Sequence, residues 1–138
     1  MQARDLAITD IRIGDHAHFE HVFLEEDVQL FSELSGDTNP LHMDEVYAAT
    51  TSFGKRIVHG MLVASLCSRM VGMYIPGKRC LYLHQTLAFK KPVFISDILE
   101  VAGSVVAKSD VTKVLTIEIY IKKAETVVLK GEARVQVM

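Results

Sequence analysis

The stretch HGMLVASLCSRMVGMYIPG, residues 59–77, is largely apolar and carries a single charge, that of Arg69. It predicts a helix of about 15 residues that ends at Pro76-Gly77, because proline and glycine interrupt helices. A helix with so few charges is expected to be buried nearly all round. One side of it is thin enough for a sheet to approach closely, because its residues are small: Gly60, Ala64, Ser65, Ser68 and Gly72.

Four segments after this helix alternate apolar and polar residues: 81–90, 98–108, 114–123 and 126–138. A period of two over several strands is typical of an antiparallel sheet with one buried and one solvated face. The residues expected on the buried face are Leu81, Leu83, Gln85, Leu87, Phe89, Leu99, Val101, Val105, Ala107, Leu115, Ile117, Ile119, Ile121, Val127, Leu129, Ala133, Val135 and Val137. Gln85 is polar, so it needs a hydrogen-bond partner there or a contact with substrate. Since only one long apolar helix can cover that face, we predict an α+β fold in which an antiparallel sheet wraps the helix.

A strand and a helical insert precede the central helix. Residues 17–24 are expected to form the first strand. Residues 25–36 have apolar residues at three-residue spacing, acids in the first turn and Gly36 as a stop, which predicts an amphipathic helix. Residues 43–51 predict another short helical piece. The length of 138 residues and the lack of a linker indicate one domain, residues 1–138.

The segment SGDTNPLHMDE, residues 35–45, brings a carboxylate and an imidazole together in one tight bend. Asn39 is a good N-cap and Pro40 a favoured first helical residue, so a helical turn is predicted to begin at Pro40. His42 would then lie near the positive end of that turn, which disfavours the imidazolium and leaves the ring able to accept a proton. Asp37 beside such a ring would provide general acid–base catalysis on a water molecule. The alternative is that Asp37 only caps a turn and His42 only packs in a helix.

The segment RIVHGML, residues 56–62, is a second candidate element. Gly60 opens the central helix, whose first backbone N–H groups have no partner within the helix. Glycine lets a ligand carbonyl approach, and the helix dipole favours negative charge on its oxygen, so this could be an oxyanion hole. The alternative is that Gly60 only allows close packing and that His59 is a surface or capping histidine.

Composition excludes several other classes of protein. Fifteen Lys and Arg against seventeen Asp and Glu give a net charge of −2, and no basic block indicates nucleic-acid binding. The N-terminus lacks the apolar core of a signal peptide, and no run approaches the roughly 20 apolar residues of a membrane span. Cys67 and Cys80 have neither metal-ligand spacing nor a disulfide framework. We therefore expect a cytoplasmic protein without membrane association, metal or redox cofactor.

Two stretches together resemble the MaoC-like (R)-specific enoyl-CoA hydratases: FSELSGDTNPLHMDEVYAATTSFGKRIVHGMLVASL, residues 31–66, and TLAFKKPVFISD, residues 86–97. The resemblance implies the hot-dog fold, in which a sheet wraps one central helix, and a homodimer that joins two sheets edge to edge. It implies that Asp37 and His42 are the acid–base pair and that the Gly60 N–H is the oxyanion donor. Asn39 matches the asparagine of the family motif, and Ser68 matches a serine that lines the pocket in close relatives.

The implied reaction is the reversible hydration of a trans-2-enoyl-CoA to the (R)-3-hydroxyacyl-CoA. Met61, Leu62 and Gln85 are further candidate substrate contacts, with core packing as the alternative for each. Two other functions fit the residues: a dehydratase acting on 3-hydroxyacyl groups of acyl carrier protein, and an acyl-CoA-binding module without turnover. The intact pair of Asp37 and His42 argues against the module, because binding alone requires neither group. The sequence leaves open the acyl-chain length, the pathway, and which of the two groups acts as the base.

Overall fold

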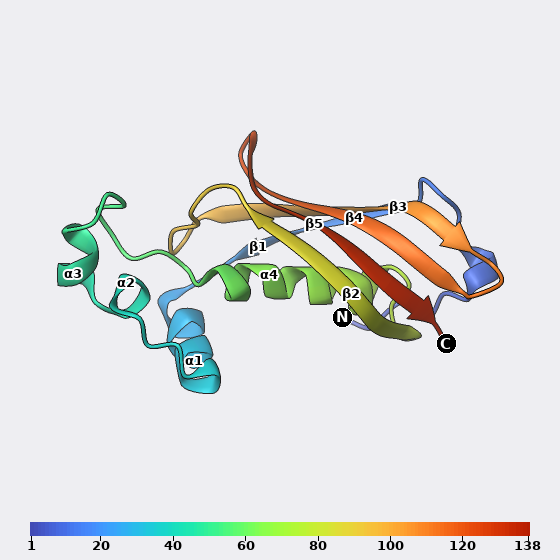
Figure 1. Cartoon of the computed structure of the whole chain (residues 1–138), viewed down its shortest axis with the longest axis horizontal. Helices are drawn as coiled ribbons and strands as arrows, with labels where there is room; N and C mark the ends of the chain where they lie inside the picture. The colour runs from blue at the N-terminus through green and yellow to red at the C-terminus, as the bar shows by residue number, and fades with distance from the viewer.

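The computed structural model describes residues 1–138, and its centre is a five-stranded antiparallel sheet (Figure 1). The strands are β1 (His16–Val22), β2 (Cys80–Phe89), β3 (Ile98–Ser109), β4 (Val114–Lys123) and β5 (Thr126–Val137). Their order across the sheet is β1-β3-β4-β5-β2, and each neighbouring pair is antiparallel. The prediction of one early strand and four late ones is confirmed.

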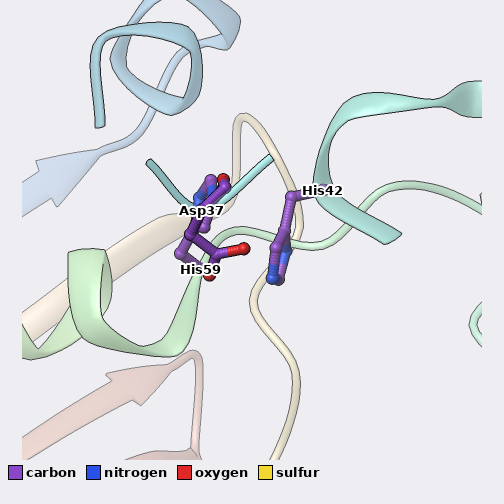
Figure 2. Close-up of side chains that lie close together, drawn as sticks. All are labelled: Asp37, His42 and His59. Carbon is purple, nitrogen blue, oxygen red and sulfur yellow. The ribbon is translucent and has the colours of Figure 1, made fainter. Parts of the chain in front are cut away.

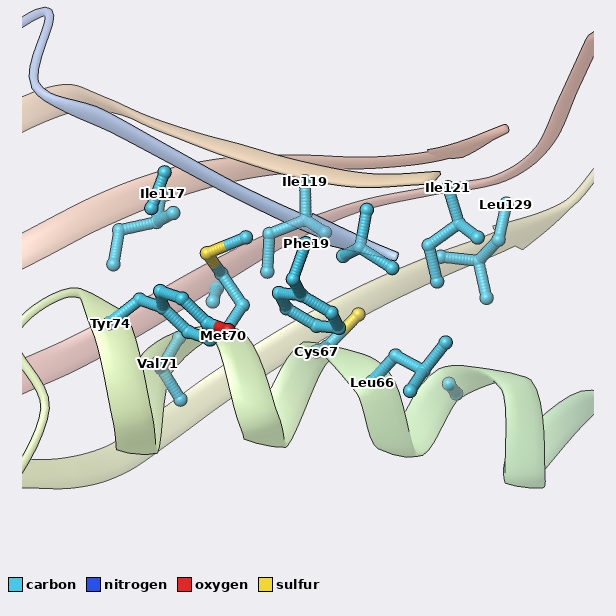
Figure 3. Packing of buried hydrophobic residues seen from close by; sticks show 14 of the residues in the cluster. Phe19, Leu66, Cys67, Met70, Val71, Tyr74, Ile117, Ile119, Ile121 and Leu129 are labelled. Atoms are coloured by element: carbon cyan, nitrogen blue, oxygen red, sulfur yellow. The ribbon is translucent and has the colours of Figure 1, made fainter. Parts of the chain in front are cut away.

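The central helix lies along one face of this sheet (Figure 1). It consists of α4 (Gly60–Arg69) and a π-helical turn, Met70–Tyr74, that continues it. Figure 3 shows side chains of both parts pointing at the isoleucines of β4. Met70 packs against β3 at Gly103, where a Cβ atom would lie 2.8 Å from the Met70 Cγ. The absence of a side chain at Gly103 therefore lets the helix approach the sheet.

The core is centred on the layer between this helix and the sheet, and its cluster contains 27 buried apolar residues. Leu115, Ile117, Ile119 and Ile121 of β4 have no exposed surface at all. Burying one such side chain contributes roughly 1.5–3 kcal/mol. The alternation in β3, β4 and β5 thus predicted the buried face, because those strands have neighbours on both sides and the helix below them.

The central helix is not buried all round, which corrects the prediction from its composition. Its buried residues, such as Val63, Leu66, Cys67 and Met70, recur at helical spacing on the side that faces the sheet. Met61 is 59% exposed, and Ser65 and Ser68 are exposed as well. The sheet covers only one side of the helix, so the small serines lie away from it rather than against it.

Strand β2 is an edge strand, and its predicted inward face is largely exposed. Leu81, Leu83 and Phe89 are 46%, 52% and 52% exposed. The reason is its place at the end of the strand order, where it is hydrogen-bonded to β5 alone. A smaller error concerns Ala107, which is exposed because a register shift between Val105 and Ala107 interrupts the alternation.

The helical insert lies beyond one end of α4, apart from the sheet (Figure 1). It comprises α1 (Glu25–Ser35), α2 (Pro40–Met43) and α3 (Glu45–Ala49). Gly36 ends α1 with φ of 77°, a left-handed conformation that glycine adopts without strain. The predicted helix and its glycine stop are confirmed. None of the helices is long and apolar enough to cross a bilayer.

Candidate active site

The bend between α1 and α2 is shaped by a series of short-range hydrogen bonds. Oγ of Ser35 accepts the N–H of Asp37 at 3.1 Å, and Oδ1 of Asp37 accepts the N–H of Asn39 at 3.2 Å. Oδ1 of Asn39 in turn accepts the N–H of Leu41 at 2.9 Å, so Asn39 caps α2 and Pro40 is its first residue. The predicted start of this helix is confirmed, and each polar side chain of the bend satisfies the next backbone amide.

A backbone carbonyl selects the tautomer of the neutral His42 ring. Its Nδ1 lies 2.8 Å from the carbonyl oxygen of Ile57, so Nδ1 carries the proton and donates it. The neutral ring then has a lone pair on Nε2, which can accept a proton from water.

Asp37 and His42 meet beside a third side chain, that of His59 (Figure 2). One ligand-type atom from each of the three lies within 4.8 Å of the others. Asp37 is exposed, His42 is half-buried and His59 is only 1% exposed. The cluster is therefore open to water on the carboxylate side and closed on the side of His59. Two imidazoles and a carboxylate could also coordinate a metal ion.

His59 is buried, so it is not the surface histidine considered from the sequence. It is the N-cap residue of α4, as the other alternative had it, although its side chain makes no capping hydrogen bond. Its ring stacks on that of His42, and its Nε2–H donates to the backbone carbonyl of Asp37 at 2.9 Å. Burial lowers its pKa below the usual value of a histidine. These contacts span 17 and 22 residues of sequence, and no local pattern indicates them.

Gly60 opens α4, and its N–H donates to no acceptor in the chain. A Cβ atom at this position would lie 3.0 Å from Cε1 of Phe89, so a side chain would press on that ring. Gly60 also lines a cavity of about 270 Å³ together with Phe89, Lys90 and Lys91. The amide is therefore free to donate to a ligand, and the residue that carries it lines this cavity.

Of the other predicted substrate residues, several lie away from the cavity that Gly60 lines. Leu62 is half-buried and lines a second, largely apolar cavity of about 250 Å³ with Phe31. Met61 and Ser68 lie on the exposed side of α4 and line neither cavity. Gln85 also lies away from both cavities, where its side chain accepts the Tyr82 hydroxyl and donates to the carbonyl of Thr86. Its need for a hydrogen-bond partner is thus met within the chain.

Comparisons with known proteins agree with this fold. A family model for the MaoC-like domain matches residues 3–127. The (R)-specific enoyl-CoA hydratase of Rhodospirillum rubrum is 40% identical, over 99% of this chain and 97% of the relative. The mitochondrial 3-hydroxyacyl-[acyl-carrier-protein] dehydratase of Arabidopsis thaliana is 35% identical, over 91% of this chain and 76% of the relative. The (R)-hydratase of A. caviae involved in PHA biosynthesis has a similar structure, with a TM-score of 0.89 and 39% identity over 93% of this chain and 98% of its own.

A sheet that wraps one central helix, shared with an (R)-hydratase at this similarity, defines the hot-dog fold. The chain belongs to the MaoC-like domain family. The relatives are hydratases and dehydratases, so the predicted class of enzyme, a hydro-lyase, is confirmed.

Proposed function

We propose that the protein is an (R)-specific hydratase that adds water reversibly to trans-2-enoyl-CoA. The observation that carries this proposal is the meeting of Asp37 and His42 beside the buried His59, whose next residue in the chain, Gly60, has a free N–H. The likeness to the R. rubrum hydratase, which extends over nearly the whole of both chains, supports the same reaction.

In this reaction Asp37 and His42 transfer the protons, and the Gly60 amide stabilises the negative charge. Water held by Asp37 and His42 adds through its oxygen to C3 and loses a proton to one of these groups. The other group delivers a proton to C2, so a C–O and a C–H bond form while the double bond becomes a single bond. In between, negative charge develops on the thioester oxygen, where the Gly60 N–H donates to it. Losing one such donor typically costs roughly 3–4 kcal/mol of barrier.

A second copy of this chain is the proposed partner at the edge of the sheet. The outer edge of β2 has no strand beside it, and Leu81, Tyr82 and Leu83 expose apolar surface there. Exposed edges of this kind pair readily with another strand. We therefore propose a homodimer joined through β2, which light scattering after gel filtration would identify by its mass.

A dehydratase acting on acyl carrier protein is the second candidate, and the likeness to the A. thaliana enzyme favours it. The acid–base chemistry is the same and only the carrier differs. Lys90 and Lys91 line the cavity next to Gly60 and form no ion pair within the chain. They are therefore available to the phosphates of CoA, of which acyl carrier protein presents only the one that links its pantetheine arm.

The decisive experiment mixes the purified protein with crotonyl-CoA and follows the enoyl-thioester absorbance. We expect the absorbance to fall, the product to be the (R)-3-hydroxy isomer, and prior dialysis against a chelator to leave the rate unchanged. Faster turnover of crotonyl-acyl carrier protein would favour the second candidate. Binding without any absorbance change would identify a non-catalytic module, and an (S) product would contradict the stereochemistry proposed here.

A further inference from the structure

His59 is adjacent to each of the three groups that the proposed function uses. Its ring stacks on the His42 ring, with 4.0 Å between centroids and 28° between planes. Its Nε2–H donates to the Asp37 carbonyl, and its own carbonyl accepts the N–H groups of Leu62 and Val63 in the first turn of α4. Gly60 follows it directly in the chain. One buried residue thus touches the acid, the base and the start of the oxyanion helix (Figure 2).

We propose that His59 is a positioning residue, which fixes Asp37, His42 and the Gly60 amide relative to one another during hydration. This inference rests on the proposed function. The bend that carries Asp37 is exposed, and the bonds to Ser35 and Asn39 give it a shape without tying it to the core. The hydrogen bond from His59 joins that bend to a side chain 22 residues further along the chain.

The ring of His59 is itself held in place. It is 1% exposed, and Phe31 of α1 contacts it edge-on, with ring centroids 4.9 Å apart. A side chain locked by packing is a suitable support for catalytic groups, because a displacement of about 1 Å can cost roughly 100-fold in rate.

The neutral form of His59 suits this place. Its Nε2 must carry a proton to donate to the Asp37 carbonyl, and its Nδ1 is buried without a hydrogen-bond partner. The charged or titratable groups that face it are Asp37 and His42, while Phe31 on α1 is uncharged. Burial, the main cause, and the nearby His42 lower the pKa of His59 and outweigh the opposing effect of Asp37, so the neutral ring is favoured.

Two substitutions separate positioning from mere packing. His59→Phe keeps the ring and its packing but loses the donor to Asp37, and it removes the unpartnered Nδ1. His59→Gln keeps an N–H donor at a similar reach but loses the aromatic stack. His18→Gln is the control, because His18 is exposed on β1.

If His59 positions the pair, His59→Phe stays about as stable as the native enzyme, while its kcat for crotonyl-CoA falls roughly 10- to 100-fold and its KM hardly changes. His59→Gln is less stable yet more active than His59→Phe, and His18→Gln matches the native enzyme. A merely structural residue would give the opposite order, with activity following stability. Near-native kcat in His59→Phe would therefore overturn the inference, whereas failure of the native enzyme to hydrate crotonyl-CoA would overturn the proposed function.

A measurement on the native enzyme covers the case in which neither variant folds. Long-range ¹H–¹⁵N spectra report which ring nitrogen of each histidine carries a proton. We expect the neutral ring of His59 at pH 7.5 to carry its proton on Nε2. A proton on Nδ1 instead would overturn the inference.

Discussion

The sheet and the helical insert are held together in different ways. In β4, alternate residues from Leu115 to Ile121 are completely buried, and both edges of the strand are hydrogen-bonded. In α1, α2 and α3 together, only Val28, Ser32 and Ala48 are buried. The insert depends instead on caps, short-range hydrogen bonds and the contacts of His59. The difference teaches that stability lies in the sheet, whereas the proposed chemistry lies in a segment that contributes little to it.

The largest expected effect is the loss of activity in Asp37→Asn, which should change catalysis in the insert without changing the stability of the sheet. Asparagine keeps an oxygen that can accept the N–H of Asn39, so the bend should survive, but it cannot take part in proton transfer. We expect kcat for crotonyl-CoA hydration to fall by about 10²–10⁴ with an unchanged melting temperature. The control is Asp44→Asn in the same insert, where Asp44 caps α3. Full activity in folded Asp37→Asn would show that Asp37 takes no part in the proton transfer.

The converse change is Ile119→Ala in the middle of β4. Ile119 is completely buried, and truncating such a side chain costs about 2–5 kcal/mol of unfolding free energy. We expect urea unfolding to show this loss while the activity per folded molecule stays close to native. Val106→Ala on β3 is the control, because Val106 is 44% exposed. A large drop in the activity of folded Ile119→Ala would mean that the two regions are not separate.

The sheet and the bend could both be predicted from the sequence, because each is determined by residues that are close together in the chain. The alternation of apolar and polar residues in β4 indicates which face is buried, and Asn39-Pro40 indicates where α2 begins. The failures all depend on residues far away in the chain. Nothing within β2 indicates that it ends the strand order, and nothing near His59 indicates that it lies against α1 and α2. Such contacts depend on how distant segments are arranged in the fold, and the local pattern of apolar and polar residues carries no information about that arrangement.

A smaller effect is expected at the cavity that Gly60, Lys90 and Lys91 line. Replacing both Lys90 and Lys91 by alanine removes two unpaired charges beside Gly60 without touching Asp37 or His42. If they meet phosphates of CoA, KM for crotonyl-CoA should rise about five- to tenfold, since exposed charge pairs contribute up to about 1 kcal/mol each. KM for the crotonyl thioester of N-acetylcysteamine, which has no phosphate, should not change. The matched control replaces Lys78 and Arg79, which pair with Asp5. Equal changes for both substrates would rule out phosphate contact.

The smallest expected effect concerns pH, and it lies where the insert and the core meet. Burial lowers the pKa of His59 in the folded protein, so below the usual histidine value of about 6.5 the unfolded chain binds more protons than the folded one. The free energy of unfolding must then fall as pH decreases from about 7 towards the folded-state pKa, by at most about 1.4 kcal/mol per pH unit, and should be unaffected by His59 at higher pH.

His21 on β1 adds to the same trend, since burial and Arg69 lower its pKa too. In urea unfolding at pH 7.5 and pH 5.5, His59→Phe should therefore lose less stability on acidification than the native protein does, without abolishing the loss. His18→Gln should lose as much as the native protein. An unchanged loss in His59→Phe would mean that this ring takes up its proton in the folded state as readily as in the unfolded one. The insert and the core would then meet at a hydrated junction rather than at a buried ring.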